Sequence, residues 1–192
     1  MSKAKVTRPC VDELTPYTPG KPIEEVQREF GLTDVVKLAS NENPLGPSPK
    51  AVEAICEAAR EVRLYPDNDC YHLRRALADH LGVAGKQVLI GHGSDELIHN
   101  IGLAFVAPGD EVMMCVGPFS QYEFTAKLME ARPVYVPMQD FRYDVAEMAR
   151  RMTGRTKVVF VGNPNNPTGT MVTRAELAEL MAAAPAGAIV VM

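Results

Sequence analysis

The second half of the chain alternates short apolar runs with helix-like stretches, and this alternation most constrains its fold. Apolar runs bounded by turn-forming residues are typical of buried strands, and they occur at 87–90, 111–116, 133–137, 157–161 and 188–191. Helical patterns lie between them, at 95–106, before about Ala131, at 144–152 and at 173–183. Strands that alternate with helices predict an α/β fold, with a mainly parallel sheet and helices on both of its faces.

The first half of the chain predicts helices and little sheet. Prolines and weak periodicity indicate an extended arm over residues 1–37, with one candidate helix at Ile23–Phe30. A short strand is expected at Lys37–Ser40, before a proline-rich loop. A helix is expected to begin at Pro49, and a second one covers about Tyr71–Leu81. The arm has no core of its own, so we expect it to pack on another element or on a second subunit.

Three helix starts carry capping signals. Ser48 precedes Pro49, which is the order of an N-cap residue and a first-turn proline. The segment D-V-A-E at 144–147 resembles a capping box with Asp in place of Ser or Thr, and T-R-A-E at 173–176 is a complete capping box.

Two loops that follow predicted strands are candidate ligand sites. The asparagine loop, N-P-N-N-P-T-G at 163–169, contains two prolines that can neither extend the strand nor start a helix at once. The glycine loop, G-H-G-S-D-E at 91–96, follows another predicted strand. Open α/β sheets bind their ligands at the carboxyl ends of the strands. Taken alone, the asparagine loop equally fits a turn built from turn-forming residues.

The glycine loop could bind a phosphate, because free backbone N–H groups and the positive end of a helix dipole would meet there. It lacks the third glycine of G-x-G-x-x-G and the spacing of a P-loop, so it is neither a dinucleotide nor a Walker motif. Asp95 and Glu96 suit a helix N-terminus, but their carboxylates would have to turn away from a phosphate. A tight turn without a ligand is the alternative.

Composition excludes several classes of protein. The hydrophobic content of 46% supports a real core, and the net charge of −4 argues against nucleic acid or an anionic membrane as partner. The N-terminus shows no signal peptide, and the longest apolar tract, 180–192, is too short to span a bilayer. The four cysteines show no C-x-x-C pairing, which is typical of idle thiols in a reducing compartment. A cytoplasmic protein is therefore expected.

No metal site is expected from the sequence. Asp67, Asp69, Cys70 and His72 could be drawn as a cluster of ligands, but their spacing also fits a polar turn. The sequence also lacks the nucleophile elbow of a Ser/His/Asp hydrolase.

Taken together, the loops resemble those of the fold-type I pyridoxal-phosphate aminotransferases, and most closely the histidinol-phosphate aminotransferases. The segments that carry the resemblance are P-Y-T-P-G-K-P-I-E-E-V (16–26), L-A-S-N-E-N-P-L-G-P-S-P (38–49), Y-P-D (65–67), G-S-D-E-L-I (93–98), P-F-S-Q-Y (118–122) and N-P-N-N-P-T-G (163–169). N-P-T-G alone would indicate only the aminotransferase superfamily. The arm motif together with N-E-N-P-L-G narrows the resemblance to this family or to relatives such as threonine-phosphate decarboxylase.

The resemblance implies pyridoxal 5'-phosphate as the cofactor and assigns residues to it. Asn166 would donate a hydrogen bond to the phenolic oxygen of the cofactor. Ser94, Asp95 and Glu96 would line a cup for its phosphate, chiefly through backbone N–H groups. Phe119 would stack on the pyridine ring; the family usually has Tyr there, so a hydroxyl hydrogen bond is lost and the tuning of the cofactor changes.

Three further residues would complete the site. Tyr65 would reach the cofactor phosphate from a partner subunit, so the active site would belong to a homodimer. Tyr17 would contact the phosphate of the bound substrate, and Asn43 would lie in the loop over that substrate. The substrates implied are small molecules, histidinol phosphate or a related amino acid and 2-oxoglutarate.

The family's domain plan implies three parts for this chain. These are an arm at 1–37 that contacts the dimer partner and substrate, a linker loop and helix at 38–70 that lead toward a small domain, and a partial cofactor-binding large domain at 71–192. The predicted last strand has no helix after it, so we expect a large domain that is incomplete at its C-terminus. None of the lysines in this sequence lies in a segment that resembles the family's Schiff-base lysine motif. We therefore expect transamination from the full-length protein and no activity from this chain alone.

Three functions remain open from the sequence. The first is transamination of histidinol phosphate with 2-oxoglutarate in histidine biosynthesis. The second is the activity of a related aromatic aminotransferase or a threonine-phosphate decarboxylase. The third is a non-catalytic protein that keeps the fold for binding or assembly.

Overall fold

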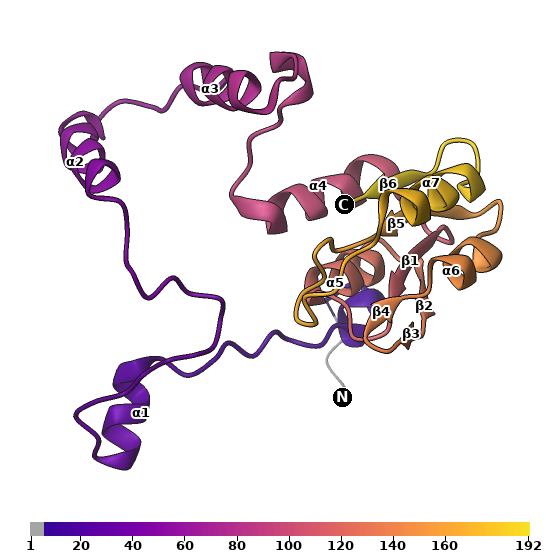
Figure 1. Ribbon diagram of the computed structural model, residues 1–192, viewed down its shortest axis with the longest axis horizontal. Coiled ribbons are helices and arrows are strands. Elements are labelled where there is room, and N and C mark those ends of the chain that lie inside the picture. The colour runs from indigo at the N-terminus through magenta and orange to yellow at the C-terminus, as the bar shows by residue number, and fades with distance from the viewer. Residues whose placement is uncertain (1–5) are drawn as a thin grey trace. The chain divides into compact units, whose positions relative to one another are not determined.

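The computed structural model describes residues 6–192, and they form two units (Figure 1). The first, the sheet unit, comprises the residues up to Tyr17 together with Gly91–Met192. The second, the helical unit, comprises Thr18–Ile90. The three functional parts that the sequence suggests, divided after residues 37 and 70, stay a prediction.

A parallel sheet of four strands forms the centre of the sheet unit, in the order β2–β1–β5–β6. Its strands are β1 (Glu111–Cys115), β2 (Arg132–Val136), β5 (Thr156–Phe160) and β6 (Ile189–Val191). In register, Met113 lies opposite Val134 on one side and Val159 on the other. The predictions of four of the six strands and of a parallel sheet are thereby confirmed.

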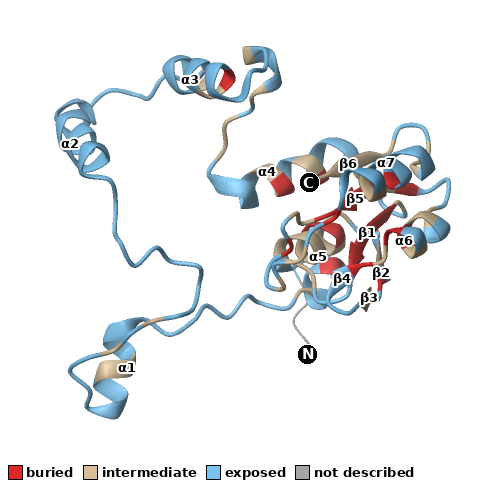
Figure 2. Cartoon of the chain, in the orientation of Figure 1, coloured by how far each residue is buried: buried red, intermediate tan, exposed pale blue. Residues whose placement is uncertain are grey.

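Helices cover both faces of this sheet, as predicted. The helices α4 (Gly93–Phe105) and α5 (Ser120–Leu128) lie on one face, and α6 (Val145–Arg151) and α7 (Arg174–Ala183) lie on the other. Successive residues of β1 point to opposite faces, so Met114 packs with Ile98 while Met113 packs with Leu180. Figure 2 shows the buried residues gathered along the strands of this sheet.

Close packing of α4 on α5 depends on a glycine. A Cβ atom at Gly102 would lie 2.3 Å from Cγ2 of Thr125, which is buried in α5. Only a residue without a side chain fits there, so Gly102 allows the two helices to approach on this face of the sheet.

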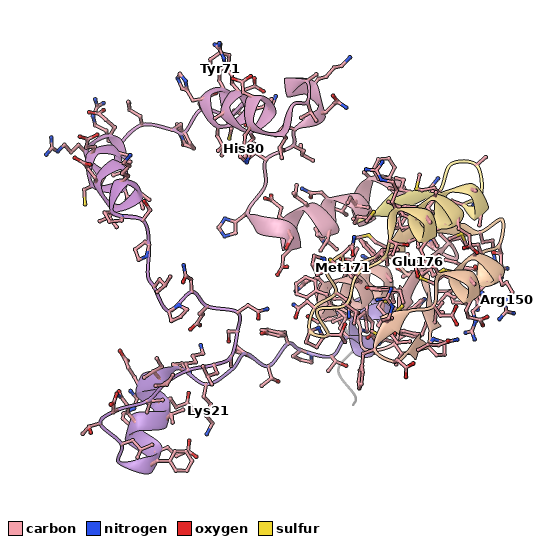
Figure 3. All side chains as sticks on the ribbon, in the orientation of Figure 1. Lys21, Tyr71, His80, Arg150, Met171 and Glu176 are labelled. Carbon is pink, nitrogen blue, oxygen red and sulfur yellow. The ribbon has the colours of Figure 1, made fainter. Side chains whose placement is uncertain are left out.

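The predicted caps of α6 and α7 are present. Asp144 accepts a hydrogen bond from the backbone N–H of Glu147 at 2.9 Å. Thr173 Oγ1 accepts from the N–H of Glu176 at 3.3 Å, and the carboxylate of Glu176, labelled in Figure 3, accepts from the N–H of Thr173 at 2.7 Å. These bonds satisfy helix-end donors that would otherwise lack partners.

Two small elements of the sheet unit have no counterpart in the sequence-based prediction. An antiparallel hairpin consists of β3 (Met138–Gln139) and β4 (Arg142–Tyr143). A short 3-10 helix, η1 (Pro9–Glu13), lies beside α5, where Lys127 donates to the carbonyl oxygen of Glu13 at 3.2 Å. Cys10 of η1 is buried there, so the first part of the arm packs on the sheet unit.

The helical unit contains the predicted helices. They are α1 (Ile23–Phe30), α2 (Pro49–Ala58), which continues into the 3-10 helix η2 (Ala59–Glu61), and α3 (Tyr71–Leu81), which is followed by η3 (Gly85–Gln87). Ser48 occupies the N-cap position of α2, but its side chain makes no capping hydrogen bond. None of the helices that the structure describes is both long enough and apolar enough to cross a membrane.

The strands predicted at Lys37–Ser40 and 87–90 are wrong. Both segments are irregular, and Gln87 belongs to η3. Ser40 has a positive φ of 68°, which a strand does not allow. Leu38 and Leu89 are 95% and 69% exposed, and no described strand pairs with either segment. A run of apolar residues forms a strand only where a neighbouring strand accepts its backbone hydrogen bonds.

A buried carboxylate joins the amino ends of three strands. Glu111, at the start of β1, is fully buried and accepts hydrogen bonds from Arg132 at 2.5 Å, from Arg155 at 2.9 Å and from Thr153 at 2.8 Å. Burial alone would raise the pKa of Glu111, but these donors lower it to about 2. Arg132 begins β2 and Arg155 directly precedes β5, so this one side chain connects the neighbours of β1.

Replacement of Glu111 tests this connection. We expect Glu111→Gln to lower the free energy of unfolding by about 2 kcal/mol, because an uncharged amide cannot replace hydrogen bonds between a carboxylate and two guanidinium groups. Urea unfolding of the whole protein measures the difference. Glu130→Gln is the matched control, since Glu130 pairs with Arg8 at the surface and its loss should cost less than about 1 kcal/mol. Equal effects of the two variants would contradict the assignment.

The same residue predicts a dependence on pH. The pKa of Glu111 is lower in the folded protein, about 2, than its ordinary value of 4.5. Its contribution to stability is therefore complete above about pH 4.5 and is lost as the pH falls toward about 2. The difference in urea midpoint between wild type and Glu111→Gln should shrink across this window. A difference that stays constant there would count against the lowered pKa.

Candidate functional site

The asparagine loop is held in place by its own side chains. Asn163 accepts the backbone N–H of Val172 at 2.9 Å through Oδ1. Asn165 is buried, donates from Nδ2 to Thr168 Oγ1 at 2.8 Å, and donates its backbone N–H to the carbonyl oxygen of Thr170 at 2.8 Å. These bonds occupy the amide groups of Asn163 and Asn165, so both residues hold the shape of the loop.

Asn166 differs from the other two asparagines. Its side chain is exposed, and within residues 6–192 it makes no hydrogen bond. An amide that lies next to Pro167 in a well-anchored loop, and has no partner among the described residues, is available to a ligand.

The start of α4 provides free backbone donors. Its N-cap position is His92, whose side chain makes no capping hydrogen bond. Gly93 has φ of 73°, a conformation that allows the chain to turn sharply into the helix. Glu96 turns back so that its carboxylate accepts the N–H of His92, and it therefore does not turn away from the start of the helix. The first-turn amides near Ser94 take no part in this bond and can donate to a ligand.

Residues from three separate segments line one hollow. Ser94 lies in the first turn of α4, Phe119 directly precedes α5, and Asn166 lies in the asparagine loop. The hollow has a volume of about 210 Å³, and the rest of its lining consists of Tyr122, Gly162, Pro164 and Asn165. The hollow combines an amide, a hydroxyl and aromatic rings, which is the usual mixture of a small-molecule site.

Aromatic contacts fix the position of Phe119. The ring of Tyr122 lies parallel to that of Phe160, with centroids 4.2 Å apart and an interplanar angle of 4°. Phe119 meets Tyr122 edge to face, with centroids 5.6 Å apart. Burial raises the pKa of Tyr122, so its phenol keeps its proton. Since Phe160 is buried at the end of β5, these contacts hold Phe119 against the carboxyl end of the sheet.

The remaining predicted site residues lie outside this lining. Asp95 and Glu96 are exposed in the first turn of α4, and Tyr17 is largely exposed at the end of the first segment of the sheet unit. Asn43 and Tyr65 belong to the helical unit; Asn43 Oδ1 accepts the N–H of Leu45 at 3.0 Å, and Tyr65 is fully exposed. The roles assigned to all of these residues stay predictions.

Two tyrosines near the hollow have no role in the sequence-based prediction. Tyr122 follows Phe119 by three residues at the start of a helix, a spacing that returns to the same face and could have indicated it. Tyr143 of β4 accepts the N–H of Gly162 at 2.9 Å and donates to Oδ1 of Asn165 at 3.0 Å. Tyr143 is distant in sequence from both partners, and no pattern of neighbouring residues indicates the contact.

Known proteins resemble this chain over nearly its whole length. The chain is 50% identical over 185 residues to the histidinol-phosphate aminotransferase of Moorella thermoacetica, with 96% of the chain and 48% of that protein aligned. It is 48% identical to the histidinol-phosphate aminotransferase of an Anaeromyxobacter species, with 96% of the chain and 51% of that protein aligned. The chain thus spans about half the length of the curated relatives it matches.

Two solved structures agree in fold. The histidinol-phosphate aminotransferase of Sinorhizobium meliloti, crystallised in complex with pyridoxal-5'-phosphate, superposes with a TM-score of 0.85 and 26% identity, over 98% of this chain and 50% of that one. The N-succinyldiaminopimelate aminotransferase of Mycobacterium tuberculosis superposes with a TM-score of 0.70 and 28% identity, over 87% of this chain and 46% of that one. The sheet covered on both faces is therefore the fold-type I aminotransferase large domain.

A family model confirms the relationship suggested by the loops. The model described as "Aminotransferase class I and II" matches residues 33–192, which include the glycine loop, the hollow and the asparagine loop. With this match, the close relatives and the shared fold, the chain belongs to the class I and II aminotransferase family.

Proposed function

We propose that the whole protein is a pyridoxal-phosphate-dependent aminotransferase that transfers the amino group of histidinol phosphate to 2-oxoglutarate, a reaction of histidine biosynthesis. The proposal concerns the whole protein because this chain spans about half the length of its relatives. The names of those relatives support the substrate, and the ligand of the Sinorhizobium meliloti structure supports the cofactor. We further propose a cytoplasmic homodimer.

One observation carries the proposal: Ser94, Phe119 and Asn166, which are far apart in sequence, line one hollow at the carboxyl edge of the sheet. Each fits one part of pyridoxal phosphate. The free amides at the start of α4 suit the phosphate, the ring of Phe119 suits the pyridine ring, and the unbonded amide of Asn166 suits the phenolic oxygen. The residues present in the hollow are therefore compatible with this cofactor.

The cofactor, when bound, supplies the electron sink that transamination requires. The chain's own residues would orient it. The backbone amides near Ser94 would fix the phosphate and Phe119 would keep the pyridine ring flat against the sheet edge. Asn166 would donate from Nδ2 and so stabilise negative charge on the phenolic oxygen. Tyr17 and Asn43 would contact the substrate, and Tyr65 would reach the cofactor phosphate of the partner subunit.

Activity measurements on the whole protein test the substrate. The amino donors to compare are histidinol phosphate, phenylalanine and phosphothreonine, with 2-oxoglutarate as the acceptor and carbon dioxide release followed in parallel. The highest kcat/KM is expected for histidinol phosphate. A preference for phenylalanine, or decarboxylation of phosphothreonine, would assign the protein to another branch of the family. A protein that reacts with none of them and binds no pyridoxal phosphate would overturn the proposal.

The role of Asn166 gives a spectroscopic prediction. Removal of its hydrogen bond in Asn166→Ala should raise the pKa seen in the visible absorbance of the bound cofactor by about one unit, because the ionised phenolic oxygen loses a donor. Absorbance titration of the loaded protein measures this pKa. Asn100→Ala, at an exposed asparagine of α4, is the control and should titrate like wild type. An unchanged titration of Asn166→Ala would remove the assigned role.

The shared active site predicts complementation. In a mixed dimer of a Tyr65→Phe subunit and an Asn166→Ala subunit, one of the two sites would contain Tyr65 and Asn166 intact, while the other would lack both. We expect the mixed dimer to regain about half of the wild-type activity and cofactor retention, above both variant homodimers, by simple counting of sites. Kinetic assays of purified mixed dimers measure the gain. A mixed dimer that is no better than the average of its parents would exclude a site shared in this way.

A further inference from the structure

The β3–β4 hairpin is attached to the asparagine loop at two places. The hydroxyl of Tyr143, in β4, contacts Gly162 and Asn165. Thr170, just after the loop, donates from Oγ1 to the carbonyl oxygen of Phe141, in the turn of the hairpin, at 2.7 Å. This hairpin is the small antiparallel element that lies outside the main sheet, and these are its hydrogen bonds to the segment around Asn166.

The hydroxyl of Tyr143 both accepts and donates a hydrogen bond. Oη accepts the backbone N–H of Gly162 at 2.9 Å and donates its proton to Oδ1 of Asn165 at 3.0 Å. The side chain is 8% exposed, and burial raises the pKa of Tyr143 to about 12, so the phenol keeps the proton that it donates. The amide of Asn165 is thereby fixed in orientation, since its Nδ2 donates on the other side to Thr168 at 2.8 Å.

The three partners meet in a confined space. A Cβ atom at Gly162 would lie 3.3 Å from Oδ1 of Asn165 and 3.4 Å from the hydroxyl of Tyr143. Gly162 and Asn165 both line the hollow, and they lie on either side of the turn that leads to Asn166. The hydroxyl of Tyr143 therefore holds the backbone on the sheet side of the turn and the side chain that directly precedes Asn166.

Asn166 itself contributes nothing to its own position through hydrogen bonds in the described chain. Its place depends on the loop around it, in which Asn165 directly precedes Asn166 and bonds to Thr168 and Gly169 on the other side of it. We propose that Tyr143 is a positioning residue for this site: its hydroxyl, bonded to Gly162 and Asn165, sets where the amide of Asn166 stands in the hollow. The inference rests on the proposed function in that it takes Asn166 as a ligand of pyridoxal phosphate.

The first test needs no cofactor. Tyr143→Phe keeps the ring and removes only the hydroxyl, so the Gly162 N–H loses its acceptor. In the cofactor-free whole protein, amide hydrogen exchange of the peptide that covers residues 161–170 should become about tenfold faster, from the loss of one buried hydrogen bond. Tyr135→Phe is the matched control: Tyr135 is another sheet tyrosine, its hydroxyl interacts with Glu123, and it is not part of the hollow. Its exchange in this peptide should match that of wild type.

The second test asks whether Tyr143 acts through Asn166. With pyridoxal phosphate bound, Tyr143→Phe should raise the pKa of the visible absorbance in the same direction as Asn166→Ala and by less. In the double variant the shift should equal that of Asn166→Ala alone, because a residue that only positions Asn166 has no effect once its amide is gone. A merely stabilising residue would leave this pKa unchanged.

Several results would overturn the inference. Unchanged exchange in Tyr143→Phe means that the hydroxyl does not hold the loop, and additive pKa shifts in the double variant mean that Tyr143 does not act through Asn166. For a Tyr143→Phe protein that fails to fold, the Gly162 amide of the wild-type protein is measured instead, and exchange as fast as that of an unprotected amide would show that the Tyr143 hydroxyl does not hold it and would contradict the proposal. If the whole protein binds no pyridoxal phosphate, the proposed function fails, and the exchange rates alone decide whether Tyr143 holds the loop.

Discussion

The pairing of β1 with β5, buried on both faces, is the interaction on which the rest of the structure depends. All residues of β1 are buried, and in β5 only Lys157 is partly exposed. Parallel strands run in one direction, so the segments that leave β1 and β5 emerge at the same edge of the sheet. That edge carries Phe119 and the asparagine loop. At the opposite edge, Glu111 and its arginine partners connect the amino ends of β1, β2 and β5 without entering the hollow.

The asparagine loop shows how a polar segment can be rigid and still leave one group for a ligand. A loop at a sheet edge must satisfy its buried polar groups, since each one left without a partner costs free energy. Asn163 and Asn165 meet this need with bonds to Val172, Thr168 and Thr170. Asn166 is exposed, so its amide needs no partner within the loop, and it lines the hollow. Three asparagines within four positions therefore have different roles: Asn163 and Asn165 hold the loop, and Asn166 is available to a ligand.

Much of the fold could be predicted from local patterns. The helices of both units, the caps at Asp144 and Thr173, and four strands follow from periodicity and capping chemistry, which act over a few residues. The strand predicted at 87–90 and the one at Lys37–Ser40 failed because pairing requires a neighbour, and apolar sequence alone does not supply one. The β3–β4 hairpin was missed because two-residue strands are too short to show alternation.

The sequence by itself determined the family, the α/β class and three of the residues that line the hollow. Its loop motifs lie in the order typical of the class I and II aminotransferases, and such motifs are contiguous and readable without coordinates. Only the tertiary structure decided that the Asn166 side chain has no hydrogen bond within residues 6–192, that Ser94, Phe119 and Asn166 share one hollow, and that Tyr143 bonds to Asn165. The physical reason is that these contacts join residues tens of positions apart, and their distances depend on how the strands pair and not on the local order of residues.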